Sequence, residues 1–233
     1  MDKYNILVID DEKEIVDLIR IYLQNEGYNV FVGFNGIEGM EIFEKQKIDL
    51  LILDIMMPGT DGLQVCRKIR ESSNIPIIII SAKSQDIDKI LGLGTGADDY
   101  VTKPFNPMEL IARVKSQLRR FYYFNTQPQS NNDKYIIEIS GLTINKISHT
   151  VSLLGNAIDL TPTEYEILLL LAGNPGRVFS AEEIFLSVWK EKYYDSNNTV
   201  MVHIWRLREK IEANPKEPEI IKTVWGVGYK IED

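Results

Sequence analysis

Carboxylate, hydroxyl and amine side chains follow directly after four short apolar runs in the first half of the sequence. The runs are residues 6–9, 50–53, 77–80 and 100–102, and the side chains that follow them are Asp10 and Asp11, Asp54, Ser81 and Lys103. Apolar runs of this length that alternate with helical patterns predict buried parallel strands. In an open α/β sheet the functional groups lie beyond the carboxyl ends of the strands. We therefore expect three acids, one hydroxyl and one amine to meet in one pocket.

Such a pocket suits a divalent cation and a phosphoryl group. Asp10, Asp11 and Asp54 cannot all stay ionised at close range without a cation, and Mg²⁺ prefers oxygen ligands. Asp54 is the predicted nucleophile, because a carboxylate can form an acyl phosphate. Lys103 would supply positive charge and Ser81 a hydrogen bond to the phosphoryl oxygens, and phosphoryl transfer needs little beyond such positioning.

Three other interpretations of these residues fit the sequence less well. Any one of them could simply end a strand or cap a helix, but four strand ends with complementary chemistry favour a functional pocket. A phosphatase of the haloacid dehalogenase type needs a second acid two residues after its nucleophile, where this sequence has Met56. A flavin-binding flavodoxin needs a hydroxyl- and glycine-rich loop after its first strand, where Asp10-Asp11-Glu12 would repel phosphate unless a metal were bound.

Residues 1–121 alternate between strand and helix patterns five times. Strands are predicted near residues 5–10, 29–34, 50–54, 76–81 and 99–103, and helices near residues 13–26, 36–46, 62–72, 86–94 and 107–121. Five parallel strands covered by helices predict an α/β domain with a doubly wound, flavodoxin-like sheet. The polar stretch of residues 122–134 cannot bury a face and predicts a linker.

Residues 135–233 follow a different plan, that of an α+β domain. Short alternating runs come first, with Gly155-Asn156 as the predicted hairpin turn. Two capping boxes, residues 161–164 and 180–183, begin helices, and a third helix is predicted over residues 199–213. A glycine-tipped hairpin over residues 223–230 closes the chain. Strands, three helices and a final hairpin predict a winged helix-turn-helix.

Composition narrows the setting in which the protein works. The net charge of −8 and the pI of about 5.0 give no global basic character. A single cysteine, Cys66, excludes an internal disulfide and suits a reducing compartment. No apolar stretch reaches the ~20 residues of a membrane helix, and the first residues lack a signal-peptide pattern. We therefore expect a cytoplasmic protein with no membrane partner.

Several motifs carry a family resemblance. Residues 8–12 (VIDDE), 54–59 (DIMMPG) and 96–105 (GADDYVTKPF) resemble the receiver domain of bacterial two-component response regulators. Residues 161–165 (TPTEY) and 222–229 (KTVWGVGY) resemble the effector domain of the OmpR/PhoB subfamily. The order and spacing of these motifs hold over essentially the whole chain, and within the subfamily the sequence is most similar to the VanR-type regulators of vancomycin resistance.

This resemblance implies roles for the residues of the pocket. Asp54 would be the phosphoacceptor. Asp11, Asp54 and the backbone carbonyl of Met56 would hold Mg²⁺, and Asp10 would act on the ion through water. Ser81 and Tyr100 would form a switch pair that responds to the phosphoryl group.

The resemblance also implies a homodimer in the phosphorylated state. Four residues match positions that pair across its interface: Lys89, Asp99, Glu109 and Arg113. Asp98 and Arg120 are candidates for another pair, and Leu93 and Ile111 for an apolar centre. Glu109 and Arg113 lie one helical turn apart and share a face. The charges alone would equally fit a solvated surface, and Leu93, Ile111 and Val114 could instead face the receiver's own core.

In the second domain, Val200, Ile204, Leu207 and Ile211 share one face of the third helix and should be core. The other side of this helix would enter the major groove of DNA. The predicted DNA-binding residues of the helix are Thr199, Val202, His203, Arg206, Arg208 and Lys210, and those of the final hairpin are Thr223, Trp225 and Tyr229. Arg206 would reach a base edge or a phosphate. His203 could equally be a neutral, half-buried residue, and Trp205 is expected to pack on a neighbouring helix.

The sequence thus predicts a transcriptional regulator rather than a conventional enzyme. A sensor histidine kinase would phosphorylate Asp54, the receiver would dimerise, and paired winged helices would bind direct-repeat half-sites in promoter DNA. By resemblance, the loop of residues 190–197 would contact RNA polymerase. Residues 122–233 hold 11 Lys and Arg against 15 Asp and Glu, so a monomer should bind phosphates poorly and dimerisation should supply the missing affinity. The same acidity keeps an alternative open, a phosphorylation-controlled switch that binds protein.

Overall fold

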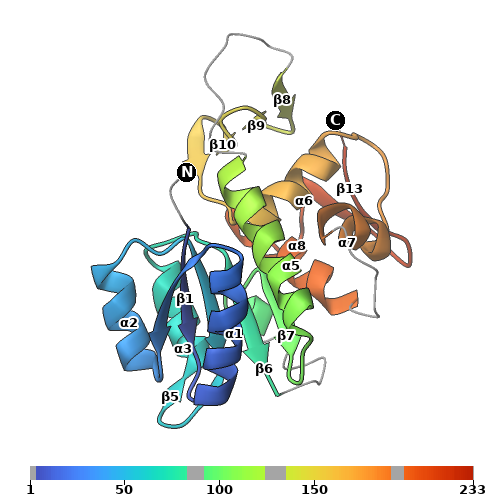
Figure 1. Ribbon diagram of the computed structural model, residues 1–233. Coiled ribbons are helices and arrows are strands. Elements are labelled where there is room, and N and C mark those ends of the chain that lie inside the picture. The colour runs from blue at the N-terminus through green and yellow to red at the C-terminus, as the bar shows by residue number, and fades with distance from the viewer. Residues whose placement is uncertain (1–3, 83–91, 124–134, 190–196, 233) are drawn as a thin grey trace. The chain divides into compact units, whose positions relative to one another are not determined.

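The computed structural model describes residues 4–82, 92–123, 135–189 and 197–232 (Figure 1). The chain forms two compact units, Met1–Phe121 and Tyr122–Asp233. None of the helices in these described ranges is both long and apolar enough to cross a membrane.

The first unit is built on a five-stranded sheet whose neighbouring strands all run parallel. Its strands are β1 (Asn5–Ile9), β2 (Asn29–Gly33), β3 (Leu50–Asp54), β6 (Ile77–Ser81) and β7 (Asp99–Thr102). The order across the sheet is β2-β1-β3-β6-β7. This is the flavodoxin-like doubly wound order, so the predicted fold class is confirmed for this half of the chain.

Helices cover both faces of this sheet (Figure 1). Helices α1 (Lys13–Asn25) and α5 (Pro107–Leu118) pack together on one face, and α2 (Gly36–Lys45) and α3 (Gly62–Arg70) pack together on the other. The apolar residues of β1, β3 and β6 from Ile6, Leu50 and Ile77 onward have no exposed surface. Burial on both faces explains why these strands read as continuous apolar runs rather than alternating ones.

A close backbone approach ties α3 to the end of β3. A Cβ atom at Gly62, the first residue of α3, would lie 2.2 Å from the backbone oxygen of Asp54. The Asp61 side chain caps this helix by accepting a hydrogen bond from the Leu63 backbone N–H. A short hairpin of β4 (Met56–Met57) and β5 (Thr60–Asp61), which the sequence did not predict, links β3 to α3.

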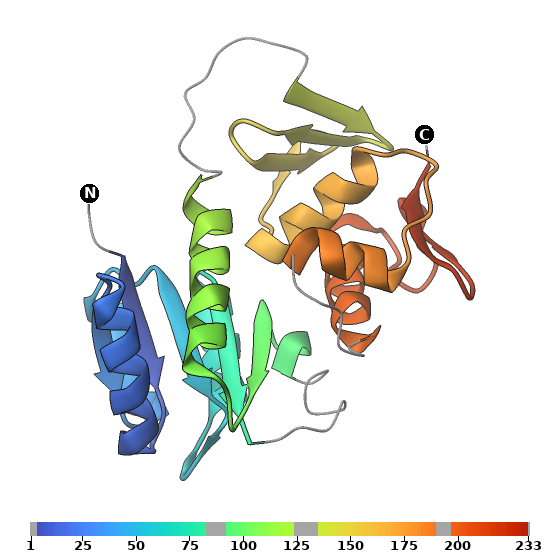
Figure 2. The ribbon, with the colours of Figure 1, turned by 45° about the vertical axis from the view of Figure 1, so that its right-hand side comes forward.

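The second unit begins with a four-stranded antiparallel sheet. Its strands are β8 (Ile136–Ile139), β9 (Leu142–Asn145), β10 (Thr150–Leu153) and β11 (Asn156–Ile158), and they lie in the order β11-β10-β9-β8. Helices α6 (Pro162–Ala172), α7 (Ala181–Trp189) and α8 (Asn197–Ile211) follow, and the hairpin of β12 (Ile221–Val224) and β13 (Gly228–Ile231) closes the unit (Figure 2). This arrangement is that of a winged helix, as predicted.

Two of these helices begin at the capping boxes that the sequence predicts. Thr161 and Glu164 form a reciprocal capping box at the start of α6. Ser180 and Glu183 make the same pair of side-chain to backbone hydrogen bonds at the start of α7. The apolar residues Val200, Ile204, Leu207 and Ile211 of α8 lie in the core of the unit, as predicted.

Some boundaries differ from the prediction. The turn between β10 and β11 is Leu154-Gly155, with φ of 49° and 85°, and Asn156 is already paired with Leu153. Left-handed φ at both positions is typical of a type I′ two-residue turn, and Leu154 adopts it although its residue type gives no signal for it. Helix α8 begins at Asn197, and α5 ends at Leu118 and continues as a π-helix, η1 (Arg119–Tyr123). Most of the helix predicted over residues 86–94, and the polar part of the predicted linker, lie outside the described residues.

Candidate functional site

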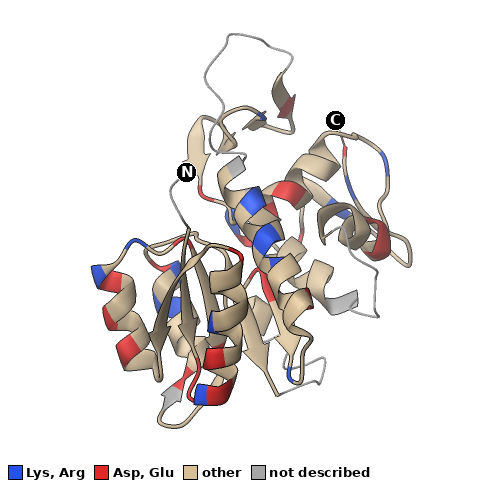
Figure 3. Cartoon of the chain, in the orientation of Figure 1, with Lys and Arg blue, Asp and Glu red and all other residues tan. Residues whose placement is uncertain are grey.

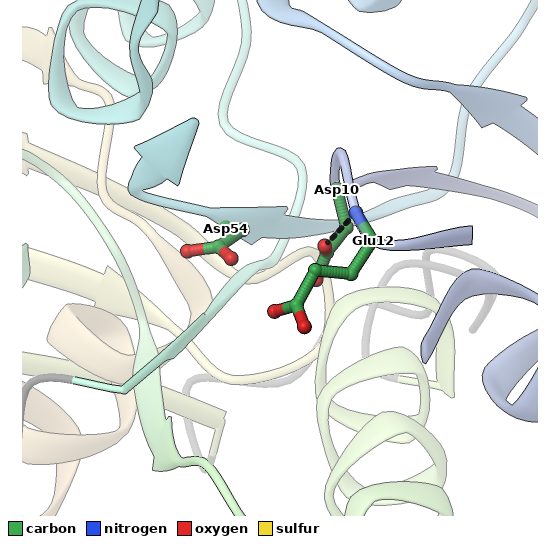
Figure 4. Close-up of side chains that lie close together, drawn as sticks. All are labelled: Asp10, Glu12 and Asp54. Atoms are coloured by element: carbon green, nitrogen blue, oxygen red, sulfur yellow. Dashed lines mark hydrogen bonds between the residues drawn. The ribbon is translucent and has the colours of Figure 1, made fainter. Parts of the chain in front are cut away.

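The carboxyl ends of β1, β3 and β7 bring Lys103 together with three carboxylates. The Lys103 Nζ atom lies 2.8 Å from Asp10 Oδ2, 2.8 Å from Glu12 Oε1 and 2.6 Å from Asp54 Oδ2. The side chains of Asp10 and Asp54 are buried, and that of Glu12 is exposed. Figure 4 shows the three carboxylates gathered on one side of the strand ends.

Backbone N–H groups hold two of these carboxylates in place. The Glu12 N–H donates to Asp10 Oδ1 at 2.9 Å (Figure 4), and the Met56 N–H donates to Asp54 Oδ1 at 2.8 Å. Each acid therefore keeps its second oxygen, Oδ2, directed to Lys103. Asp54 thus has one oxygen fixed by a backbone N–H and a second oxygen held by Lys103, whose ammonium group could bind a phosphoryl oxygen instead.

Burial and neighbouring charges shift the pKa values of Asp10 and Lys103. Burial raises the pKa of Asp10, and its hydrogen bond from Lys103 only partly opposes that effect. Burial by itself lowers the pKa of Lys103, but hydrogen bonds to Asp10, Asp54 and Glu12 outweigh it, so the pKa stands above its ordinary value. Lys103 is therefore fully charged at neutral pH.

The acidic cluster fits a divalent cation. Asp10, Glu12 and Asp54 each offer a carboxylate oxygen, and these oxygens lie within 4.8 Å of one another. One lysine cannot balance three acids, so a cation with oxygen preference suits the site. The sequence prediction named Asp11 as a ligand and did not name Glu12, and the role of Asp11 stays a prediction. Asp11 is partly buried and is not among the clustered acids of the described residues, and the run of three acids after β1 was the signal that could have pointed to Glu12.

The predicted switch pair lies on the two neighbouring strands at the edge of the sheet. Ser81 ends β6, is fully buried and is in register with Thr102 of β7. Tyr100 is half-buried in β7, and its ring lies close to Gly92, where an added Cβ atom would be 3.0 Å from Tyr100 Cε2. Ser81 therefore ends its strand beside the strand ends of the pocket, and Tyr100 lies on the next strand, in register with Ile79.

The residues predicted for a dimer face fall into three groups: residues paired within one chain, buried residues and residues outside the described structure. Arg113 bonds both Asp99 oxygens at 3.1 and 3.0 Å and also Glu109 Oε1 at 2.8 Å, all within one chain. Leu93, Ile111 and Val114 are buried and supply no exposed apolar surface here. Lys89 and the side chain of Arg120 lie outside the described part of the structure.

Asp98 departs from its predicted place at that face. It has no exposed surface, and its Oδ2 accepts from Arg70 Nη2 at 2.6 Å and from the Ile77 N–H at 2.9 Å. Arg70 also donates to the backbone oxygens of Gly96, Ser73 and Ile75. The structure thus assigns Asp98 to an internal ion pair of the first unit rather than to its surface.

Several predicted DNA-binding residues of α8 also face inward. Val202 and His203 are buried, and the His203 ring lies 5.5 Å from that of Trp189. Arg208 is buried and donates to the Ile221 backbone oxygen and to Thr223 Oγ1, so it holds the hairpin to α8. A single helix period cannot distinguish a long side chain that reaches solvent from one that reaches a neighbouring strand.

The exposed surface of α8 has a different composition from the prediction. Met201, Trp205 and Glu209 are exposed one turn apart, and Trp205 Nε1 donates to Glu209 Oε1 at 3.0 Å. Trp205 therefore lies on the surface instead of packing on a neighbouring helix. Thr199 at the start of the helix is partly buried.

Arg206 and Lys210 turn toward a buried carboxylate instead of projecting freely. The Lys210 Nζ lies 2.7 Å from Glu164 Oε2, and Arg206 Nη2 lies 3.7 Å from Glu164 Oε1. Burial would raise the pKa of Glu164, but Arg206 and Lys210 outweigh burial and the pKa stands below its usual range. Glu164 was predicted only as a capping residue, and nothing in its spacing from α8 indicated this ionic role.

The hairpin presents its tip to solvent. Trp225 is 90% exposed and Val227 is 57% exposed, on either side of Gly226. Tyr229 is half-buried and its backbone pairs with Phe179. At the base of the hairpin, Lys222 and Lys230 both pair with Glu232. Figure 3 shows Lys and Arg interspersed with Asp and Glu along the chain.

Comparison with known proteins agrees with both units. Residues 6–115 match the response regulator receiver domain, and residues 155–231 match the C-terminal domain of transcriptional regulatory proteins. The chain is 51% identical over 228 residues to the regulatory protein VanRc of Enterococcus gallinarum. The aligned region covers 97% of this chain and 98% of that protein. It is 42% identical to the transcriptional regulatory protein ResD of Bacillus subtilis, covering 100% of this chain and 98% of that protein.

A solved structure with the same organisation supports the assignment. The crystal structure of the response regulator DrrB, a Thermotoga maritima OmpR/PhoB homolog, aligns over 100% of both chains with 34% identity and a TM-score of 0.52. The resemblance found in the sequence motifs is therefore confirmed over the full length of the chain. This protein belongs to the response regulators of the OmpR/PhoB type, phosphorylation-activated transcriptional regulators that join a receiver domain to a C-terminal DNA-binding domain.

Proposed function

We propose that Asp54 is the phosphoacceptor of this regulator and that a sensor histidine kinase is the donor. The observation that carries the proposal is the contact of 2.6 Å between the Asp54 carboxylate and Lys103 Nζ at the end of the buried strand β3. Asp54 Oδ2 would attack the phosphorus of a phosphohistidine, the P–N bond would break, and the imidazole would leave and take up a proton. Lys103 would then hold a phosphoryl oxygen in place of the carboxylate oxygen.

Mg²⁺ is the cofactor that the pocket suits best. When bound by Asp54 and its neighbouring acids, the ion would neutralise charge on the phosphoryl group. The Asp10, Glu12 and Asp54 cluster supports this proposal, as does the excess of acids over Lys103. The roles of Asp11 and of the Met56 carbonyl, and that of Ser81 and Tyr100 as a switch, remain part of the same proposal.

The second half of the proposal is that phosphorylated dimers bind direct repeats in promoter DNA through α8 and the hairpin. The exposed hairpin tip at Trp225 and the basic residue Arg206 near the surface of α8 support this. The net acidity of residues 122–233 makes a dimer necessary for firm binding. RNA polymerase would be contacted through the predicted loop of residues 190–197, most of which lies outside the described structure.

Three measurements test this function in order. Incubation with Mg²⁺ and acetyl phosphate should add one phosphoryl mass to the parent and none to Asp54→Asn. Sedimentation should show a monomer-to-dimer shift on phosphorylation, which Arg113→Asp should abolish. Selection of duplexes from a random pool with the phosphorylated protein should return two half-sites in direct repeat. A phosphoryl mass on Asp54→Asn would show that another residue is the acceptor.

A protein-binding effector is the alternative, because the exposed residues Met201, Trp205 and Glu209 of α8 include no cation. Trp225→Ala and Arg206→Ala distinguish the two functions. Both variants should weaken binding to the selected duplex if the hairpin and α8 touch DNA. Arg206→Ala should cost roughly 1–3 kcal/mol if Arg206 contacts a base. Unchanged DNA binding in both variants would favour the protein-binding alternative.

A further inference from the structure

Glu164 lies at the N-terminus of α6 with no exposed surface and faces two cations of α8. Its Oε2 accepts from the Thr161 N–H at 2.9 Å and from Lys210 Nζ at 2.7 Å. Its Oε1 faces Arg206 Nη2 at 3.7 Å. One buried carboxylate therefore caps the start of α6 and also faces two cations from α8.

The two cations are held very differently. Lys210 donates both to Glu164 and to the Asp159 backbone oxygen, at 2.7 and 2.8 Å. In the part of the chain that the structure describes, Arg206 has only its contact of 3.7 Å with Glu164, which is too long for a hydrogen bond. Within the described residues, Arg206 Nη1 and Glu164 Oε1 are both buried without a hydrogen-bond partner. Lys210 is thus the firm partner of the carboxylate and Arg206 is the loose one.

Buried polar atoms without partners are uncommon and call for an explanation. If Arg206 served only to neutralise Glu164, a bidentate contact at hydrogen-bond distance would be the expected geometry. The observed geometry instead leaves Arg206 Nη1 without a partner among the described residues, so another anion could bind the guanidinium once this side chain, 12% exposed, turns outward. Because Lys210 stays with Glu164, Arg206 can leave without stranding a buried charge.

We propose that Glu164 competes with DNA for Arg206 and so sets the affinity of the α8 surface. This rests on the proposed function, in which α8 contacts DNA. In the free protein Glu164 attracts Arg206 to the helix interface. When DNA binds, Arg206 leaves Glu164 and contacts a phosphate or a base edge. Lys210 alone then balances the charge of Glu164. Glu164 is then a positioning residue that acts on DNA through Arg206 and weakens binding to all sequences.

The test is a double-mutant cycle in the phosphorylated full-length protein, measured by fluorescence anisotropy on a duplex selected from a random pool and on a scrambled duplex. Glu164→Gln removes the charge and keeps an oxygen that can accept from the Thr161 N–H. It should tighten binding to both duplexes by roughly fivefold, the upper range for a weak ion pair. In the Arg206→Ala background the same substitution should change nothing, because no competing cation is left.

Glu209→Gln is the matched control, since it removes an exposed carboxylate from the same helix. Its effect should be the same with and without Arg206. Weaker binding by Glu164→Gln, or an equal gain in both backgrounds, would overturn the proposal. Arg206→Ala with unchanged binding would instead contradict the proposed DNA face. If thermal melting shows that Glu164→Gln does not fold, Glu164→Asp, which keeps the charge but withdraws it by one methylene, should act in the same direction and depend on Arg206 in the same way.

Discussion

Lys103 and Asp54 are 49 positions apart in the sequence, yet Lys103 Nζ donates to Asp54 Oδ2 at 2.6 Å. Their strands, β3 and β7, are not neighbours, because β6 lies between them. Lys103 follows β7 and reaches across the end of β6 to the acid at the end of β3. The pocket is therefore formed by the ends of several strands together. A change in one of its charged residues should alter the ionisation of the others.

Removal of Lys103 should make the thermal stability of the protein more dependent on Mg²⁺. Lys103→Met leaves Asp10, Glu12 and Asp54 close together without their ammonium group, which is buried against two of them. Breaking a buried pair of this kind costs about 3–5 kcal/mol. We expect a lower Tm without Mg²⁺ and a larger rise in Tm on adding it than in the parent. Lys115→Met, which breaks an exposed pair with Glu26, should leave the Mg²⁺ effect unchanged. Equal Mg²⁺ shifts in parent and Lys103→Met would contradict the charge argument.

Asp98→Asn should destabilise the receiver domain. The Arg70 and Asp98 side chains are 9% and 0% exposed, so the substitution strands a buried guanidinium. Urea unfolding should show a loss of about 3–5 kcal/mol. Asp17→Asn, which breaks the exposed pair with Arg20, should cost at most about 1 kcal/mol. An Asp98→Asn protein of parental stability that no longer dimerises would return Asp98 to the dimer face.

The acyl phosphate should hydrolyse slowly because of Met56. This side chain is 50% exposed, and its backbone N–H bonds Asp54. A thioether cannot orient an attacking water as an amide or acid can. Met56→Asn should shorten the lifetime of the phosphoryl group, followed by its mass after the donor is removed. Met108→Asn, at another exposed methionine, should have no effect. A longer lifetime in Met56→Asn would remove the argument.

His149 should make the second unit lose stability in mild acid. Burial lowers the pKa of His149 to about 4 from its ordinary 6.5, and its ring lies tilted against that of Tyr165, with 4.6 Å between the centroids. The unfolded chain therefore binds this proton first, and stability should fall as the pH drops from 6.5 toward 4. His149→Asn tolerates the left-handed φ of 52° at this position. Urea midpoints against pH should be lower for this variant at neutral pH but flatter across that window. An unchanged slope would show that another group is responsible.

The sequence was sufficient for the fold because the signals there are local. Continuous apolar runs such as residues 77–80 predicted parallel strands, and the capping box of Thr161 and Glu164 predicted the start of α6. The pocket followed from topology, since strand ends of one sheet must meet. The inward turn of Arg206 and Arg208 could not be foreseen, because long side chains reach partners 42 and 13 positions away that helix periodicity does not contain. The approach of Glu12 to Asp10 and Asp54 likewise depends on the backbone path after β1.

Arg70 has a mechanical consequence for signalling in the receiver. Its guanidinium fastens the segments that enter β6 and β7, through the carbonyls of Ser73, Ile75 and Gly96 and the carboxylate of Asp98. Ser81 and Lys103 stand at the opposite ends of the same two strands. Because Arg70 fastens one end of each strand, we expect any displacement that follows phosphorylation to occur at the other end, near Ser81 and Lys103, with the Arg70 end as the fixed point.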